Sequence, residues 1–167
     1  MDDMLFSEFL IFGVTGSGKT EIYLQLIEKA LEDGEKASIL LVPEISLTPQ
    51  TVNRFIARFG KEKVAVLHSK LSIGERYDQW HKIKEGKAKI IIGARSAIFA
   101  PVKDLGLVII DEEHDSSYKS EMSPRYDAKE VARKICKIAN VPLVLGSATP
   151  DMDTYFRAEN EEISLLE

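Results

Sequence analysis

A run of residues near the start of the chain has the types and spacing of a phosphate-binding loop. Gly13-Val14-Thr15-Gly16-Ser17-Gly18-Lys19-Thr20 matches the pattern G-x-x-x-x-G-K-[ST]. The glycines permit a tight turn whose backbone N–H groups face phosphate oxygens, and the positive end of a following helix faces the same anion. We expect Gly16, Ser17 and Gly18 to bind the phosphates of a nucleotide through their amides. Lys19 would reach the β- and γ-phosphates, and the hydroxyl of Thr20 would hold Mg²⁺.

A second group of residues could hydrolyse the bound nucleotide. The apolar run Leu107–Ile110 leads directly into Asp111-Glu112-Glu113-His114. Acids at the tip of a buried strand lie at the edge where open α/β sheets bind ligands. Asp111 fits the role of holding Mg²⁺, directly or through water, and Glu112 that of orienting and deprotonating the attacking water. His114 couples the phosphate site to the rest of the protein or is simply a polar loop residue.

Short apolar runs alternate with amphipathic stretches along the whole chain, which predicts the elements that position these residues. The expected strands are 9–12, 37–42, 64–67, 90–92, 107–110, 143–145 and 163–166. The expected helices are 20–31, 49–59, 72–85 and 128–139, with a short one capped by Asp151. This alternation predicts a three-layer α/β domain with a mainly parallel central sheet. We expect Trp80, Phe99 and Cys136 to pack in the interior.

Composition narrows the class of protein. The 167 residues are enough for a single domain, and the net charge of −5 excludes a polycationic coat for nucleic acids. The single cysteine, Cys136, excludes an internal disulfide framework and a cysteine-based zinc site. No apolar run has the length that crosses a membrane, so we expect no membrane partner and a cytoplasmic location.

Further segments place the phosphate loop and the acids in a longer pattern. They are Val42–Gln50 (VPEISLTPQ), Gly93–Pro101 (GARSAIFAP), Asp115–Lys119 (DSSYK) and Gly146–Pro150 (GSATP). Together with the phosphate loop and the acids, and in this order along the chain, they resemble motifs I, Ia, Ib, II and III of superfamily 2 helicases, and most closely the primosomal helicases of replication restart. The resemblance runs from Leu10 to Pro150. It implies a RecA-like first motor lobe with 3′-to-5′ translocation on single-stranded DNA, acting at stalled forks in the bacterial cytoplasm. The implied partners are single-stranded or forked DNA, other primosome proteins and single-strand-binding protein.

These segments also offer chemistry of their own for DNA contact and coupling. Hydroxyls and amides hold phosphates without reading bases, whereas aromatic rings stack on bases beside cations. The candidates are Ser46, Thr48, Arg95, Ser96, His114, Tyr118, Lys119, Arg125, Tyr126, Ser147 and Thr149. Structural alternatives stay open, because Ser46–Pro49 could be only a helix start, and Tyr118 and Tyr126 could be packing residues.

The resemblance also implies parts that this sequence does not contain. A superfamily 2 motor cleaves ATP between two lobes, and the second lobe supplies arginine fingers. We expect residues 1–167 to be one lobe of a larger protein, with weak nucleotide binding and little ATPase activity when isolated. Two competing hypotheses are a lobe of another superfamily 2 translocase, such as a restriction-system motor, and a non-catalytic nucleotide-binding module. The intact Lys19, Thr20, Asp111 and Glu112 argue against the latter.

Overall fold

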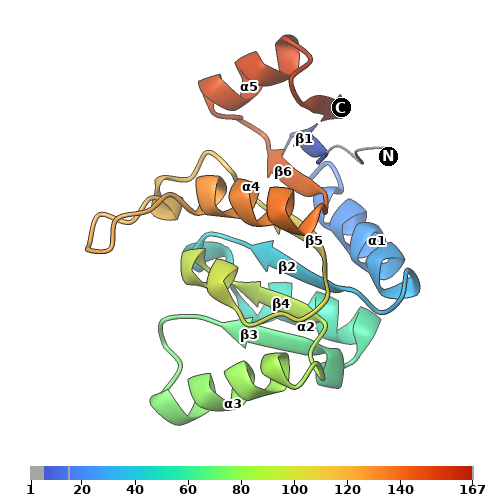
Figure 1. Ribbon diagram of the computed structural model, residues 1–167, viewed down its shortest axis with the longest axis vertical. Coiled ribbons are helices and arrows are strands. Elements are labelled where there is room, and N and C mark those ends of the chain that lie inside the picture. The colour runs from blue at the N-terminus through green and yellow to red at the C-terminus, as the bar shows by residue number, and fades with distance from the viewer. Residues whose placement is uncertain (1–5, 15, 167) are drawn as a thin grey trace.

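A seven-stranded sheet forms the centre of the molecule (Figure 1). The structure is a computed structural model and describes residues 6–14 and 16–166. The strand order is β3-β4-β2-β5-β6-β1-β7, and all recorded strand pairings are parallel. The strands are β1 (Glu8–Phe12), β2 (Ala37–Leu41), β3 (Val64–Leu67), β4 (Ile90–Gly93), β5 (Leu105–Ile110), β6 (Leu143–Ser147) and β7 (Ser164–Leu166). Parallel pairing brings the carboxyl ends of these strands to one edge, where the predicted motifs begin.

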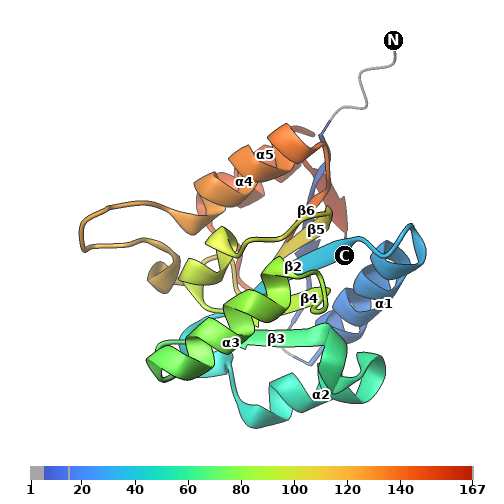
Figure 2. The same cartoon turned by 60° about the horizontal axis from the view of Figure 1, so that its bottom comes forward.

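Helices cover both faces of the sheet, which confirms the predicted three-layer α/β architecture (Figures 1 and 2). They are α1 (Lys19–Glu32), α2 (Pro49–Phe59), α3 (Ile73–Lys84), α4 (Ala128–Ala139) and α5 (Met152–Glu159). Alternate strand residues face opposite layers, as the two-residue period of a strand requires. Ile109 belongs to the core cluster that includes residues of α1 and α2, whereas its neighbours Val108 and Ile110 belong to the cluster that includes residues of α3, α4 and α5.

Local sequence signals set most helix ends where they were predicted. Ser72 and Glu75 form a complete capping box at the start of α3. Thr48 caps α2 by accepting from the backbone N–H of Thr51, with Pro49 in the first turn. Asp151 is the N-cap residue of α5 as predicted, although its side chain makes no capping hydrogen bond and its carboxylate instead pairs with Lys129 at 3.2 Å.

Two of the three aromatic and thiol packing predictions were wrong. Trp80 is 42% exposed and Phe99 56% exposed. α3 lies beside the edge strand β3, so only part of its surface has a partner, and Trp80 falls outside that part. Cys136 is fully buried on α4 as predicted, and burial raises the pKa of its thiol to about 12.

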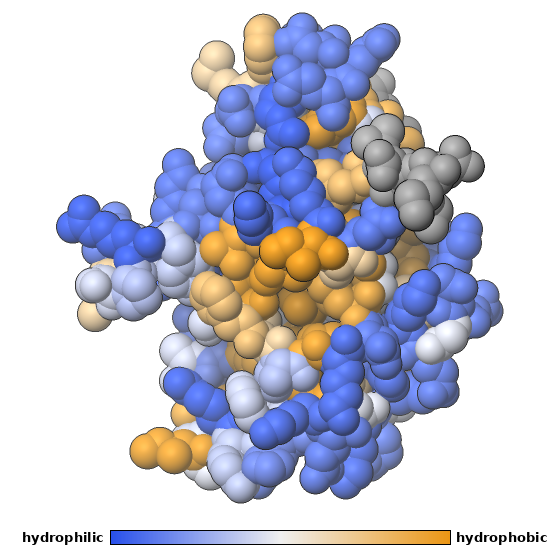
Figure 3. All heavy atoms as spheres, viewed as in Figure 1, coloured by the Kyte–Doolittle hydropathy of each residue, from blue (hydrophilic) through white to orange (hydrophobic). Residues whose placement is uncertain are grey.

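One face of the molecule leaves part of its apolar interior near the surface. Figure 3 shows hydrophobic side chains gathered in the middle of this face, below α4, between polar surfaces above and below. Partly buried Val102, Val131 and Ile135 pack against the core cluster beneath α4. The polar motifs described next lie instead at the carboxyl edge of the sheet.

Candidate nucleotide site

The predicted phosphate loop forms an open turn between β1 and α1. Gly16 and Gly18 have φ angles of 83° and 91°, in the left-handed region that glycine adopts without strain. Gly18 is the N-cap of α1 and no side chain caps that helix, so the end of the helix is left to an anion. Ser17 already donates its N–H to the Val14 carbonyl at 3.0 Å. Thr15, inside the motif, lies outside the described residues.

Lys19 is held inside this turn. Its side chain is largely buried, and Nζ donates to the carbonyl oxygens of Gly13 at 2.7 Å and Val14 at 3.3 Å. An ammonium bonds more strongly to an anionic oxygen than to a neutral carbonyl. The ammonium is therefore positioned beside the loop and can exchange carbonyl partners for a phosphate.

Two tyrosines hold Asp111 at the end of β5. Tyr23 on α1 donates its hydroxyl to Asp111 Oδ1 at 2.8 Å, and Tyr118 donates to the Asp111 carbonyl at 2.5 Å. Burial and the neighbouring carboxylate raise the pKa of the Tyr23 hydroxyl, which therefore stays a proton donor. The stacking role predicted for Tyr118 is wrong, because the residue is only 1% exposed and its ring has no free face for a base.

Tyr23 was missed as a site residue because its helical spacing identified it only as an apolar packing position. The structure shows that its hydroxyl also approaches Gly146, the first residue of GSATP. A Cβ atom on Gly146 would lie 1.7 Å from Tyr23 Oη and 3.4 Å from Asp111 Oδ1. The glycine is thus required for the tyrosine hydroxyl to reach the aspartate.

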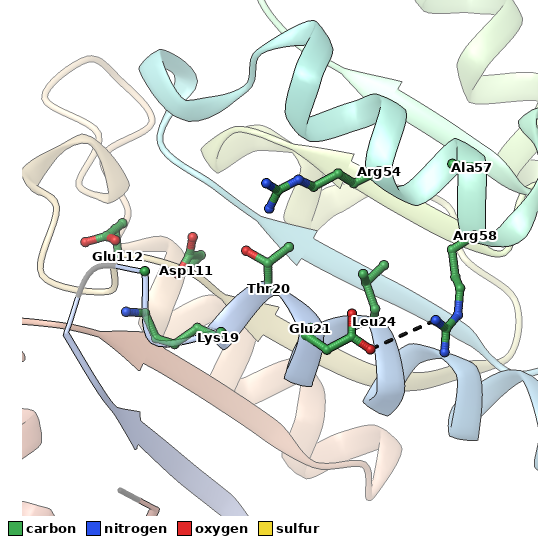
Figure 4. A pocket seen from close by; sticks show the side chains of 11 residues that line it. Lys19, Thr20, Glu21, Leu24, Arg54, Ala57, Arg58, Asp111 and Glu112 are labelled. Atoms are coloured by element: carbon green, nitrogen blue, oxygen red, sulfur yellow. Dashed lines mark ion pairs between the residues drawn. The ribbon is translucent and has the colours of Figure 1, made fainter.

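The loop and the acids face one cavity, of about 740 Å³ (Figure 4). This volume is within the range of small-molecule sites. Its lining includes Gly16, Gly18, Lys19, Thr20, Asp111, Glu112 and Arg54. Glu112 has a φ of 48°, a backbone conformation that is unusual for a residue with a side chain. The phosphate loop and the two acids, which are far apart in the sequence, therefore line the same cavity.

Arg54 is a lining residue that sequence reasoning missed. It extends from α2 across the cavity toward Thr20 and Asp111 (Figure 4). Arg58, one turn later, pairs with Glu28 at 2.7 Å, whereas no ion pair of Arg54 is recorded within residues 6–14 and 16–166. The amphipathic pattern of α2 gave no signal that this arginine turns toward the phosphate loop.

His114 connects the acids to the GSATP segment. Its Nδ1 lies 2.7 Å from the Ser147 hydroxyl, and its Nε2 lies 3.5 Å from the Thr149 hydroxyl and 3.6 Å from Glu112 Oε2. Ser147 Oγ also accepts the Thr149 N–H at 3.0 Å. This geometry favours coupling over an isolated polar loop residue.

Glu113, for which the sequence suggested no role, is fully buried behind the site. Its carboxylate accepts from Lys129 Nζ at 3.1 Å, the Asp151 N–H at 2.6 Å and the Thr154 hydroxyl at 3.0 Å. A buried charge is tolerated only when it is paired and hydrogen-bonded. Glu113 thus ties the acidic segment to α4 and α5.

Some of the predicted DNA-contact residues are exposed to solvent, and others are bonded to or packed against the rest of the protein. Thr48, Ser96, Lys119 and Arg125 are exposed, and Ser46 is half-buried in a short 3-10 helix. Arg95 Nη1 donates to the carbonyls of Ser117 and Lys119, each at 2.9 Å, so this arginine braces the segment after the acids.

Tyr126 is half-buried, and its ring meets the Phe99 ring edge-on at 5.1 Å. The Arg95 guanidinium lies 5.6 Å from the centre of the same ring. Tyr126 is therefore partly a packing residue, as the sequence left open, and partly exposed to solvent.

Comparison with known proteins assigns the family. The family model described as DEAD/DEAH box helicase matches residues 3–157. The chain belongs to the DEAD/DEAH box helicase family. As a helicase domain it binds nucleotide, which fits the cavity beside the phosphate loop.

Relatives of this DEAD/DEAH box helicase domain include two replication restart proteins. The chain is 61% identical to replication restart protein PriA of Bacillus subtilis over 95% of its own length and 19% of the relative. It is 54% identical to PriA of Chlamydia pneumoniae over 92% of its own length and 20% of the relative. The chain thus spans about a fifth of the curated relatives that it matches.

Solved structures with the same fold include the helicase domain of Hef from Pyrococcus furiosus. The two superpose with a TM-score of 0.68 at 24% identity, over 98% of this chain and 35% of the other. The comparison supports the RecA-like fold of the DEAD/DEAH box helicase domain. Within the described part of the chain, no helix is both long and apolar enough to cross a membrane.

Proposed function

We propose that this chain is the ATP-binding lobe of a 3′-to-5′ superfamily 2 DNA helicase that acts in primosome assembly and replication restart at stalled forks. The observation that carries the proposal is the cavity shared by the phosphate loop, Asp111 and Glu112. The names of the relatives supply the biological setting. Residues 1–167 would be a single lobe, with the second motor lobe and the DNA-binding domains elsewhere in a longer protein.

The phosphate loop binds the nucleotide. The amides of Gly16, Ser17 and Gly18 face the phosphates, with the Ser17 N–H released from its internal carbonyl partner. Lys19 exchanges its two carbonyl acceptors for β- and γ-phosphate oxygens. The N-terminus of α1, which lacks a side-chain cap, adds its partial positive charge.

The open glycines, the cavity and the oxygen donors of Thr20 and Asp111 fit a magnesium ion bound with the phosphates. When bound, Mg²⁺ neutralises charge on the β- and γ-phosphates. Thr20 contributes its hydroxyl, and Asp111 contributes a carboxylate whose Oδ1 is oriented by Tyr23. Fixing this carboxylate in advance lowers the entropy lost on binding.

Hydrolysis is assigned to Glu112. Its carboxylate orients the attacking water and accepts its proton, so that a hydroxide-like oxygen attacks the γ-phosphorus. The bond from the γ-phosphorus to the β,γ-bridging oxygen breaks, and ADP leaves with that oxygen and its electron pair. His114 Nε2 lies 3.6 Å from the Glu112 carboxylate. Through its contacts with Ser147 and Thr149, His114 couples the loss of the γ-phosphate to the GSATP segment. Productive turnover requires a cation from the second lobe to stabilise the transition state.

The DNA partner is single-stranded or forked, and Ser46, Thr48, Ser96, Lys119 and Arg125 contact its backbone. Arg95, from the segment that follows β4, and Tyr126, from the segment between the acids and α4, support this surface. Other primosome proteins and single-strand-binding protein are partners of the longer protein, which works in the bacterial cytoplasm.

A titration with fluorescent ATP and Mg²⁺ tests the proposal. Lys19→Ala is expected to weaken binding by at least about tenfold, because it removes charge-assisted bonds to phosphate. Glu112→Gln should preserve affinity, because that residue acts on water. Equal affinity of both variants and the parent chain would show that the nucleotide site is elsewhere.

A further inference from the structure

A second cavity, of about 510 Å³, lies beside the carboxyl ends of β3 and β4. Two large aromatic side chains line it, although both were expected in the core. Trp80 on α3 is 42% exposed, and Phe99, at the end of the 3-10 helix Arg95–Phe99, is 56% exposed. Exposed aromatic rings in a cavity cost free energy unless a ligand covers them, so they point to a binding surface.

We call this cavity the aromatic groove, which is lined by His68, Arg76, Trp80, Arg95, Ser96 and Phe99 among others. It combines these rings with positive charge. Arg76 stands one helical turn before Trp80, on the same side of α3, and no side-chain partner of Arg76 is recorded among the described residues. Lys84 Nζ lies 5.5 Å from the centre of the Trp80 ring, one turn further along.

The aromatic groove also carries one negative charge, that of Glu44, against the two positive charges of Arg76 and Arg95. The Glu44 carboxylate accepts from the Ser69 N–H at 3.0 Å and from the Ser69 hydroxyl. Ser96 adds an exposed hydroxyl. An arginine side chain with no recorded partner among the described residues, a hydroxyl and aromatic rings in one groove are the chemistry that recognises a phosphate backbone with unstacked bases.

We propose that the aromatic groove binds single-stranded DNA by stacking bases on Trp80 and Phe99, with Arg76 contacting the phosphate backbone. This inference rests on the proposed DNA partner and adds base contacts to it. Stacking tolerates every base because every base has a π-face, as a motor that moves along any sequence requires. It also explains why α3 turns its tryptophan outward at the edge of the sheet.

The chain provides its own probe, because Trp80 is its only tryptophan. The experiment titrates the chain with a fluorescently labelled oligo-dT strand and with an abasic strand of the same length and charge. Anisotropy of the label reports binding, and tryptophan emission, read with unlabelled strands, reports events at Trp80. Oligo-dT is expected to quench the emission and to bind at least about fivefold more tightly than the abasic strand.

Variants separate stacking from a structural effect. Trp80→Ala should abolish the preference for oligo-dT over the abasic strand, and Trp80→Phe should restore part of it. Tyr77→Ala is the matched control, because Tyr77 is a 62% exposed aromatic residue on the same helix that packs on His81 at 4.3 Å and is not among the residues lining the groove. It should bind both strands like the parent chain, and circular dichroism checks that every variant is folded.

The outcomes distinguish this inference from the proposed function. Oligo-dT binding that leaves tryptophan emission unchanged, with no preference over the abasic strand, would overturn the stacking site and leave the DNA partner standing. Failure to bind either strand would overturn both. Emission that shifts with protein concentration alone, and not with DNA, would assign the aromatic groove to protein contacts and refute the inference.

Discussion

Replacing Gly146 with alanine tests how the structure holds Asp111. The new Cβ would lie 1.7 Å from Tyr23 Oη and 2.9 Å from Tyr23 Cζ, so the tyrosine must shift. Its ring is only 2% exposed, so there is no open space into which it can move freely. The shift breaks the 2.8 Å bond from the Tyr23 hydroxyl to Asp111.

The magnitude follows from two contributions. Overpacking a buried position costs about 1–3 kcal/mol, and losing a hydrogen bond to a charged group costs about 1.5–3 kcal/mol. Gly146→Ala should therefore lower the free energy of unfolding by about 3–5 kcal/mol. Tyr23→Phe loses only the hydrogen bond, and in its background the alanine should cost about 1.5–3 kcal/mol less.

Urea unfolding, followed by circular dichroism, measures the free energy of unfolding of the parent chain, the two single variants and the double variant, which together form a double-mutant cycle. Gly74→Ala is the matched control, because a methyl group there would meet no atom within 4 Å beyond its chain neighbours and its own helix backbone. Alanine also favours helix, so the substitution should not destabilise α3. Both Tyr23→Phe and Gly146→Ala should also weaken the dependence of nucleotide affinity on Mg²⁺. Strictly additive costs, with no coupling between positions 23 and 146, would refute the reasoning.

Three further predictions concern charged side chains around the site. Glu113→Gln should lower the free energy of unfolding by about 3 kcal/mol, measured in urea, because it leaves buried partners without their anion; a stability equal to that of the parent would contradict this. Burial opposes ionisation of Glu8, but hydrogen bonds from Arg133 and Arg157 hold its pKa below the ordinary 4.5. Its contribution to stability is therefore complete above pH 4.5 and lost as the pH falls through the lowered pKa, and Glu8→Gln should remove this acid-dependent part of the urea midpoint. Arg54→Ala should weaken binding of fluorescent ATP by about tenfold, whereas Arg58→Ala, whose guanidinium is held by Glu28, should change it less; the reverse order would exclude Arg54 as a phosphate contact.

Much of the architecture followed from local sequence. Apolar runs of strand length, helical spacing and caps such as Ser72 act over a few residues, so they predicted the strands and the α-helices but not the short 3-10 helices between them. A parallel sheet then brings the carboxyl ends of its strands to one edge. For that reason the sequence alone could predict that the phosphate loop and the Asp111–Glu112 pair face one site.

Only the tertiary structure decided which side chains surround that site. Tyr23 and Asp111 are 88 residues apart, and no local pattern shows that the hydroxyl of one reaches the carboxylate of the other. The burial of Tyr118 and the exposure of Trp80 likewise depend on which parts of each element are covered by its neighbours. Helical and strand periods define which residues share a face, but the partner of that face is set by packing between segments distant in the chain.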